Sequence, residues 1–149
     1  MKPVIFLRIA SVMTLIHAVL HTIGGVFGKP MPGTAAMVAA TMQSNRFPVF
    51  GVMRTYTDFY MGMGLGATIT MTVETVAFWM LASLAKTESD RLRPILAAFM
   101  IQYLALAVNS YHFFFLGPVI AELLIAASLA MAIVTAKPVK AQVAVTAQA

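Results

Sequence analysis

The chain has 149 residues, of which 60% are hydrophobic and only 10% are charged, and its formal net charge is +5. Soluble domains have about 25% charged residues on average, so this composition excludes an ordinary soluble protein. The basic residues stand singly at the ends of apolar stretches, which argues against nucleic-acid binding. The absence of cysteine excludes disulfides and thiolate metal sites. The length suits one integral membrane domain of four helices, because each span needs about 20 residues.

The first apolar stretch runs from about Val4 to Phe27. We interpret it as a retained membrane helix rather than a cleaved signal peptide, because it is long for a signal peptide and has no A-x-A site before Gly24. The segment from Thr34 to Ser44 follows, between prolines, and is too short to cross a bilayer. We predict that this segment forms a short helix at the membrane interface.

Three further apolar stretches predict membrane helices over about residues 54–84, 92–115 and 119–136. A charged link over residues 86–91 separates the first two of them, and Leu116-Gly117-Pro118 predicts a tight turn between the last two. Residues 137–149 have no length left for a span and are predicted to be a disordered tail. The predicted fold is therefore all-α, with a single four-helix transmembrane domain over residues 1–136.

The basic residues predict the orientation of these four spans. The side that carries both termini and the connection over residues 86–93 holds seven of them, Lys2, Arg8, Lys86, Arg91, Arg93, Lys137 and Lys140. The opposite side holds three, Lys29, Arg46 and Arg54. Because positive charge accumulates on the cytoplasmic side, both termini are expected in the cytoplasm and the protein in a plasma membrane, surrounded by its lipids.

Polar residues within the spans gather toward the outer half of the membrane. An ionisable side chain inside a bilayer costs a few kcal/mol on insertion scales, so such residues usually pair, line a cavity or serve a function. We therefore predict an outward-facing polar pocket. The candidates for catalytic acid and base work are His17, His21, Asp58 and Glu122, and the candidates for ligand binding are Arg54, Tyr60, Asn109 and His112.

His17 and His21 are the most specific signal, because residues four apart lie on one face of a helix and can supply two ligands to one metal ion. Asp58, His112 or Glu122 would complete such a site. Acid and base catalysis, and purely structural hydrogen bonding, remain alternatives for these histidines. No cofactor is specified by the sequence; bis-histidine haem, through His21 and His112, ranks lowest.

Other polar residues have simple structural interpretations. Arg54 and Asp58 are four apart and would pair on one helix face. Tyr60 lies where an aromatic belt at the membrane interface is expected. Glu74 lies deeper than the other candidates, and a neutral Glu74 bonded to Gln102 is as good an interpretation as a proton relay.

Gly62 and Gly66 form a GxxxG pattern, which in membranes allows close helix contact. The same spacing recurs at Gly24 and Gly28. We predict a helix crossing at Gly62 and Gly66, within the chain, in a homo-oligomer or in a larger membrane complex.

The segment Arg54-Thr55-Tyr56-Thr57-Asp58-Phe59-Tyr60-Met61-Gly62-Met63-Gly64-Leu65, with the upstream Asn45-Arg46-Phe47 and Gly51, resembles the signature of a group of small, uncharacterised bacterial four-helix membrane proteins. The two-histidine first helix and the Phe113-Phe114-Phe115 turn are similar too, so the likeness covers most of residues 5–136. It implies a four-helix bundle in a bacterial inner membrane and no particular activity. A looser likeness is to DoxX-like proteins.

Three functions from different classes fit these observations. The first is a membrane-embedded bundle whose pocket binds a lipid-like or apolar small molecule, with conversion of that molecule by acid and base chemistry as an extension. The second is a non-catalytic accessory or structural subunit of a membrane complex. The third is a metal-binding membrane protein with His17 and His21 as ligands. Transport ranks below these.

Overall fold

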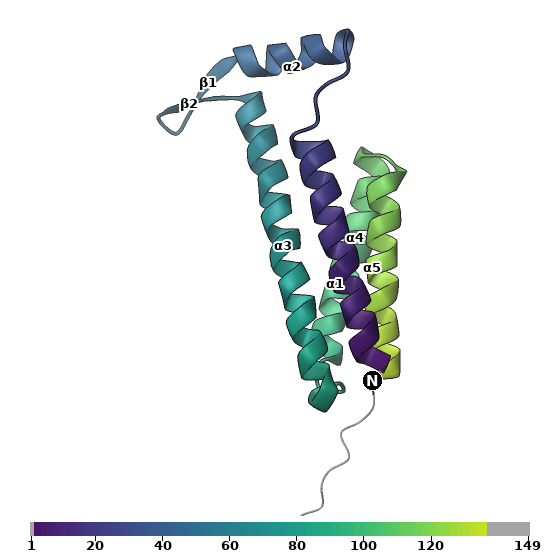
Figure 1. The fold of residues 1–149 in the computed structure, drawn as a ribbon. Helices are drawn as coiled ribbons and strands as arrows, with labels where there is room; N and C mark the ends of the chain where they lie inside the picture. The colour runs from purple at the N-terminus through teal and green to yellow at the C-terminus, as the bar shows by residue number, and fades with distance from the viewer. Residues whose placement is uncertain (1, 137–149) are drawn as a thin grey trace, which may run out of the picture. The chain divides into compact units, whose positions relative to one another are not determined.

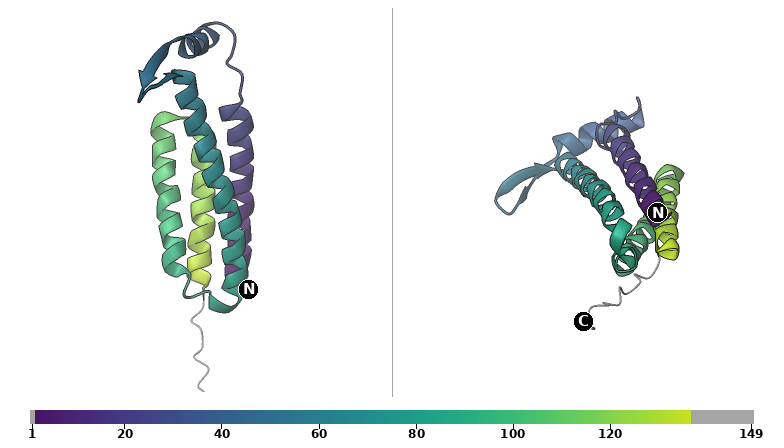
Figure 2. Two further views of the ribbon diagram at one scale, coloured as in Figure 1. Left: turned by 90° about the vertical axis from the view of Figure 1, so that its left-hand side faces the viewer. Right: turned by 60° about the horizontal axis from the view of Figure 1, so that its bottom comes forward.

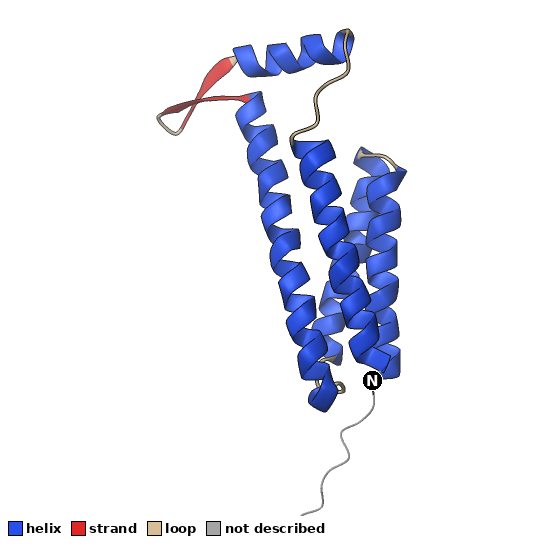
Figure 3. Cartoon of the chain, in the orientation of Figure 1, coloured by secondary structure: helices blue, strands red, loops and turns tan. Residues whose placement is uncertain are grey.

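The computed structural model describes residues 2–136, so the predicted tail over residues 137–149 lies outside the described residues. Figure 3 shows a helical protein with one small β-hairpin. In chain order the elements are α1 (Lys2–Leu20), a π-helical continuation η1 (His21–Val26), α2 (Thr34–Ser44), β1 (Arg46–Val49), β2 (Val52–Thr55), α3 (Tyr56–Glu88), α4 (Arg93–Phe113) and α5 (Leu116–Thr135).

Four helical segments are long and apolar enough to cross a membrane: Lys2–Val26, Tyr56–Glu88, Arg93–Phe113 and Leu116–Thr135. The predicted four long helices are thus confirmed, and so is a short helix over Thr34–Ser44. Large apolar side chains are exposed along all four segments, for example Ile101 at 63% and Val134 at 75%. In water such surfaces would favour aggregation, whereas helices surrounded by lipid are expected to have them.

Two details of the predicted boundaries were wrong. The second long helix begins at Tyr56 rather than near Arg54, because residues 46–55 form a hairpin. Leu116-Gly117-Pro118 is not a turn but the first turn of α5, and the chain reverses at Phe114 and Phe115. Proline is compatible with a first helical turn, because the N–H groups there have no partner within the helix.

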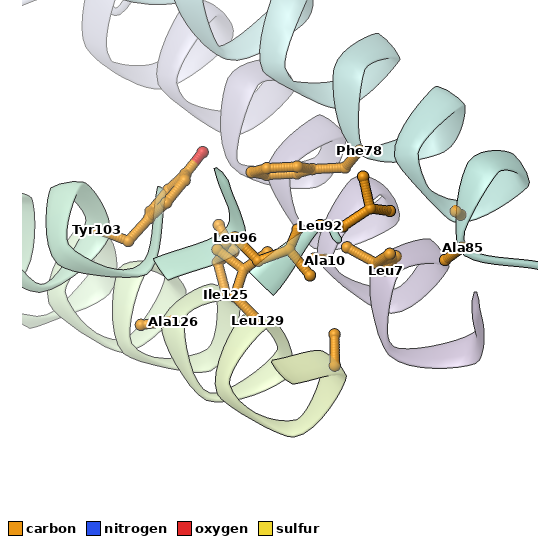
Figure 4. Close-up of a cluster of buried hydrophobic side chains, with 12 residues drawn as sticks. Leu7, Ala10, Phe78, Ala85, Leu92, Leu96, Tyr103, Ile125, Ala126 and Leu129 are labelled. Atoms are coloured by element: carbon orange, nitrogen blue, oxygen red, sulfur yellow. The ribbon is translucent and has the colours of Figure 1, made fainter. Parts of the chain in front are cut away.

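The chain folds as two compact units. The first contains the described residues up to Met13 and from Thr75 onward. In it, α4 and α5 run antiparallel and side by side (Figures 1 and 2). Its apolar core draws small and large residues from all four helices (Figure 4), namely Leu7, Ala10, Phe78, Ala82, Ala85, Leu92, Leu96, Tyr103, Ile125, Ala126, Leu129 and Ala132. The alanines allow the helices to approach closely, as membrane bundles require.

Specific contacts reinforce this first unit. The ring of Phe78 packs edge-on against Phe99, with centroids 5.0 Å apart. The hydroxyl of Ser11 donates a hydrogen bond of 2.7 Å to the carbonyl of Thr75.

The second unit comprises Thr14–Glu74. Here the chain passes from α2 through the hairpin directly into α3 (Figure 1). The hairpin strands are antiparallel, and Val49 pairs with Val52 next to a two-residue turn. Phe50 and Gly51 occupy this turn with φ of 45° and 86°. A left-handed conformation costs a non-glycine residue about 1–2 kcal/mol, so Phe50 is strained there.

Candidate functional site

The predicted site residues divide between the two units. The second unit holds His17 on α1, His21 at the start of η1, Arg54 on β2, and Asp58 and Tyr60 on α3. The first unit holds Asn109 and His112 on α4 and Glu122 on α5.

Glu122 is the most unusual polar group in the first unit. Its side chain is almost fully buried, since only 5% of its surface is exposed, and Ser110 beside it is 4% exposed. The Ser110 hydroxyl donates a 2.9 Å hydrogen bond to Oε1 of Glu122. The other carboxyl oxygen, Oε2, is buried and has no hydrogen-bond partner in the described part of the chain. An unsatisfied buried polar atom costs about 1–3 kcal/mol, so it requires an explanation.

The short connection between α4 and α5 brings Ser110 next to Glu122. Only Phe114 and Phe115 separate the two helices, so the last turns of α4 lie against the first turns of α5. Two candidates for ligand binding on α4, Asn109 and His112, are exposed, unlike the buried Ser110 between them. The His112 ring instead contacts Tyr111 edge-on, at 5.6 Å between centroids.

His21 and His17 differ in how they are bonded. Nε2 of His21 lies 3.1 Å from the carbonyl oxygen of Gly64 on α3. Because a carbonyl only accepts hydrogen bonds, Nε2 carries the hydrogen in this pair. Nδ1 of His17, in contrast, is buried and has no hydrogen-bond partner within residues 2–136. His17 therefore has an unused polar atom, whereas His21 bonds to the facing helix.

The π-helical segment η1 makes further hydrogen bonds to α3 beyond that of His21. The amide of Phe27 donates to the carbonyl of Thr22, the five-residue spacing of a π-helix. The hydroxyl of Tyr60 donates a 3.0 Å bond to the carbonyl of Gly25. The hydroxyls of Thr22 and Thr68 lie 2.9 Å apart. The predicted ligand-binding residue Tyr60 thus has a structural partner in η1.

Glycine at position 64 makes the contact possible. A Cβ atom at Gly64 would lie 2.9 Å from Cγ2 of Val26, which is closer than such atoms normally approach. At Gly62 and Gly66, in contrast, an added Cβ would meet no atom of the described residues within 4 Å. The close approach of helices in this unit is therefore at Gly64, between the two glycines of the predicted motif.

Asp58 caps the start of α3. Its backbone N–H donates to the hydroxyl of Thr55, and its Oδ2 accepts a 2.8 Å bond from the backbone N–H of Thr55. This reciprocal pair is a capping box with aspartate at the third helical position. The expected helical pairing of Arg54 with Asp58 was wrong, because Arg54 lies on β2 before the helix begins.

Loss of the Thr55 hydroxyl is expected to loosen the first turn of α3. Removal of an N-cap side chain costs about 1 kcal/mol, which corresponds to roughly fivefold faster hydrogen exchange of the first-turn amides. We expect this acceleration for Thr55→Ala, measured by hydrogen exchange in detergent. Thr57→Ala is the matched control, since Thr57 takes no part in the box; equal exchange in both variants would contradict the assignment.

Two hollows in the first unit lie apart from the predicted site residues. One, of about 270 Å³, is lined by Lys2, Ile5, Phe6, Met131 and Thr135. The other, of about 340 Å³, is lined by Ile5, Arg8, Ile9, Val12 and Met13.

Within residues 2–136 no three histidine, aspartate or glutamate side chains converge as a metal site would require. The described residues therefore place no third metal ligand beside His17 and His21.

Sequence reasoning missed several partners that define these groups. Ser110 was not among the candidates, although it and Glu122 lie within two helical turns of the Phe113–Phe115 turn. Thr22, Gly64 and Thr68 were missed as the contacts between η1 and α3. Glu74 is buried, with 6% of its surface exposed.

The chain matches no family model, no curated protein and no solved structure with which it was compared.

Proposed function

We propose that this chain is a multi-pass protein of a bacterial inner membrane, with both termini in the cytoplasm, and that it binds an apolar or lipid-like molecule from within the bilayer. Its four long apolar helices support the membrane assignment. The excess of lysine and arginine on the side of the termini supports the orientation. Kinship with the small bacterial four-helix proteins that it resembles is part of this proposal.

The observation that carries the proposal is the Oε2 atom of Glu122, which has no hydrogen-bond partner within residues 2–136. A carboxylate among apolar side chains would be several kcal/mol less stable than one in water, so Glu122 is neutral in this account. A neutral carboxyl has one O–H to donate. With Oε1 accepting from Ser110, the Oε2 hydroxyl is the group that would bind a carbonyl, ether or hydroxyl oxygen of a ligand.

His17 supplies the corresponding group in the second unit, because its Nδ1 atom is also buried without a partner in the described residues. An acid and a histidine with unused polar atoms are the residue types that proton transfer requires. Conversion of the bound molecule by acid and base chemistry would use a group of this kind. Asp58, Tyr60 and His21 have structural roles in this proposal, because each bonds to backbone groups of the second unit.

Carbodiimide labelling tests whether Glu122 is neutral and can be reached from the membrane. The carboxyl O–H adds across one C=N bond of dicyclohexylcarbodiimide, and the adduct rearranges to an N-acylurea, so the protein gains one whole reagent molecule. We expect the label on Glu122 in membrane vesicles and not on Glu88, whose carboxylate pairs with Arg91 at 3.3 Å. An unlabelled Glu122 would contradict the proposal, and Glu122→Gln is the control for the site of labelling.

A second function, as an accessory subunit of a membrane complex, is favoured by one observation. The Gly62 and Gly66 positions have open space within 4 Å of an added Cβ atom. A glycine face of this kind allows a second helix to approach closely, from another copy of this chain or from a larger complex. This function requires no bound small molecule.

A further inference from the structure

The tip of the β1–β2 hairpin is chemically unusual. Phe50 is fully exposed, with a relative exposure of 106%, and its φ of 45° lies in the left-handed region. A two-residue hairpin turn with two positive φ angles favours asparagine or aspartate before glycine. A phenylalanine is disfavoured there both by its conformation and by its contact with water. Its presence therefore points to a use for an aromatic side chain at this tip.

The surroundings of the tip are apolar and basic. Val52 and Met53 on β2 are about half exposed, at 47% and 52%. Arg46 at the start of β1 and Arg54 near the end of β2 are exposed as well. The nearest acid along the chain, Asp58, is bonded to the backbone of Thr55 in the capping box. The hairpin thus combines an apolar tip with two arginines nearer its base.

The hairpin is attached rigidly to a helix that is long enough to cross the membrane. Strand β2 ends at Thr55 and α3 begins at Tyr56, so no linker separates them. The ring of Phe47 on β1 stacks on Phe59 of α3, with centroids 5.9 Å apart, and contacts Tyr56 at 4.8 Å. The hairpin therefore stays where α3 reaches the membrane surface, and Figure 1 shows it projecting sideways from the start of α3.

We propose that this hairpin is a membrane-interface anchor: Phe50 inserts into the boundary between headgroups and acyl chains, and Arg46 and Arg54 bind phospholipid phosphates. An aromatic side chain is stable at this boundary, and basic side chains are attracted to phosphate groups there. The inference rests on the proposed membrane insertion of α3. It commits to phospholipid of the protein's own membrane, and a docked protein partner is the competing outcome.

Tryptophan fluorescence in reconstituted vesicles tests the anchor. The probe is Phe50→Trp in a Trp79→Phe background, which leaves one tryptophan in the chain. Phosphatidylglycerol–phosphatidylcholine vesicles carry bromine on the upper acyl chain in one sample and no bromine in the other. We expect the emission of the introduced tryptophan to be blue-shifted and to fall by about half in brominated lipid, because interfacial side chains lie about 5–10 Å into this boundary. Water-like emission that bromine leaves unchanged would overturn the proposal.

One further variant and the natural tryptophan keep the outcome decisive. Val52→Trp repeats the measurement one residue beyond the turn, without a change at the strained position, and should also be quenched. The natural Trp79, in otherwise unchanged protein, reports on α3 itself. Quenching of Trp79 without quenching at position 50 or 52 would overturn the anchor alone, whereas an unquenched Trp79 would overturn the membrane insertion on which it rests.

The arginines are tested in the same assay. Arg46→Gln with Arg54→Gln, in the Phe50→Trp background, should reduce the quenching because the hairpin loses its attraction to phosphate. Unchanged quenching in this variant would overturn the phosphate contact.

Discussion

Replacement of Gly64 by alanine is expected to destabilise the packing of η1 on α3 by about 1–3 kcal/mol, the usual range for an overpacked contact. The new Cβ would lie 2.9 Å from Cγ2 of Val26, which is 5% exposed and has little room to move. Separation of the helices would also weaken the 3.1 Å contact of His21 with the Gly64 carbonyl. The measurement is unfolding of the purified protein in mixed detergent, followed by circular dichroism.

Gly62→Ala is the matched control for this prediction. It makes the same change two residues earlier on the same helix, where an added Cβ meets nothing within 4 Å. We expect Gly62→Ala to leave unfolding unchanged, and Val26→Ala to restore much of the stability of Gly64→Ala, because neighbouring changes are not additive. Equal stability of the two glycine variants would show that the helices do not meet at Gly64.

The Ser110–Glu122 pair is expected to give stability effects of opposite sign. Ser110→Ala removes the hydroxyl that satisfies Oε1, so neither carboxyl oxygen then has a side-chain partner among the described residues, at a cost of about 1–3 kcal/mol. The double variant Ser110→Ala with Glu122→Leu removes both polar groups from a buried site. We expect the double variant to be as stable as the natural chain or more stable, because paired apolar replacement is close to neutral or favourable.

The same unfolding assay decides between a functional and a structural role for Glu122. If Glu122 serves binding, it is expected to lower the free energy of unfolding relative to an apolar residue at the same position. Functional sites commonly contain groups that make the fold less stable. A double variant that is much less stable than the natural chain would mean that Glu122 holds the helices together. In that case the accessory-subunit function would become the better proposal.

Much of the fold could be predicted because its main signals are length and composition. Four apolar stretches gave four long helices, and the short segment after Pro32 gave α2. The hairpin was missed because Pro48 interrupts its first strand and its turn is Phe-Gly rather than Asn-Gly. The start of α3 was readable in Thr55-Tyr56-Thr57-Asp58, a capping-box spacing, but the preceding Arg54 was assigned to the helix.

The ionisable residues of the candidate site could be singled out from the sequence, but their hydrogen-bond partners could not. Glu122 and the histidines could be singled out because ionisable residues inside apolar helices are rare. Their neighbours depend on the rotation of each helix about its axis, and helices that are apolar on nearly all sides carry no periodic signal for that rotation. Ser110 was therefore missed, and Asp58 was assigned to a pocket although it bonds to Thr55. The gathering of all eight candidate residues in one pocket stays a prediction.

Native mass spectrometry of the protein released from lipid nanodiscs tests the central claim most directly. The account predicts that the natural chain carries one apolar molecule other than detergent or bulk phospholipid. It predicts loss of that molecule in Ser110→Ala with Glu122→Leu, while Glu88→Gln, which changes an exposed carboxyl, retains it. An equally folded but empty natural chain, or a molecule that persists in the Glu122 variant, would contradict the account.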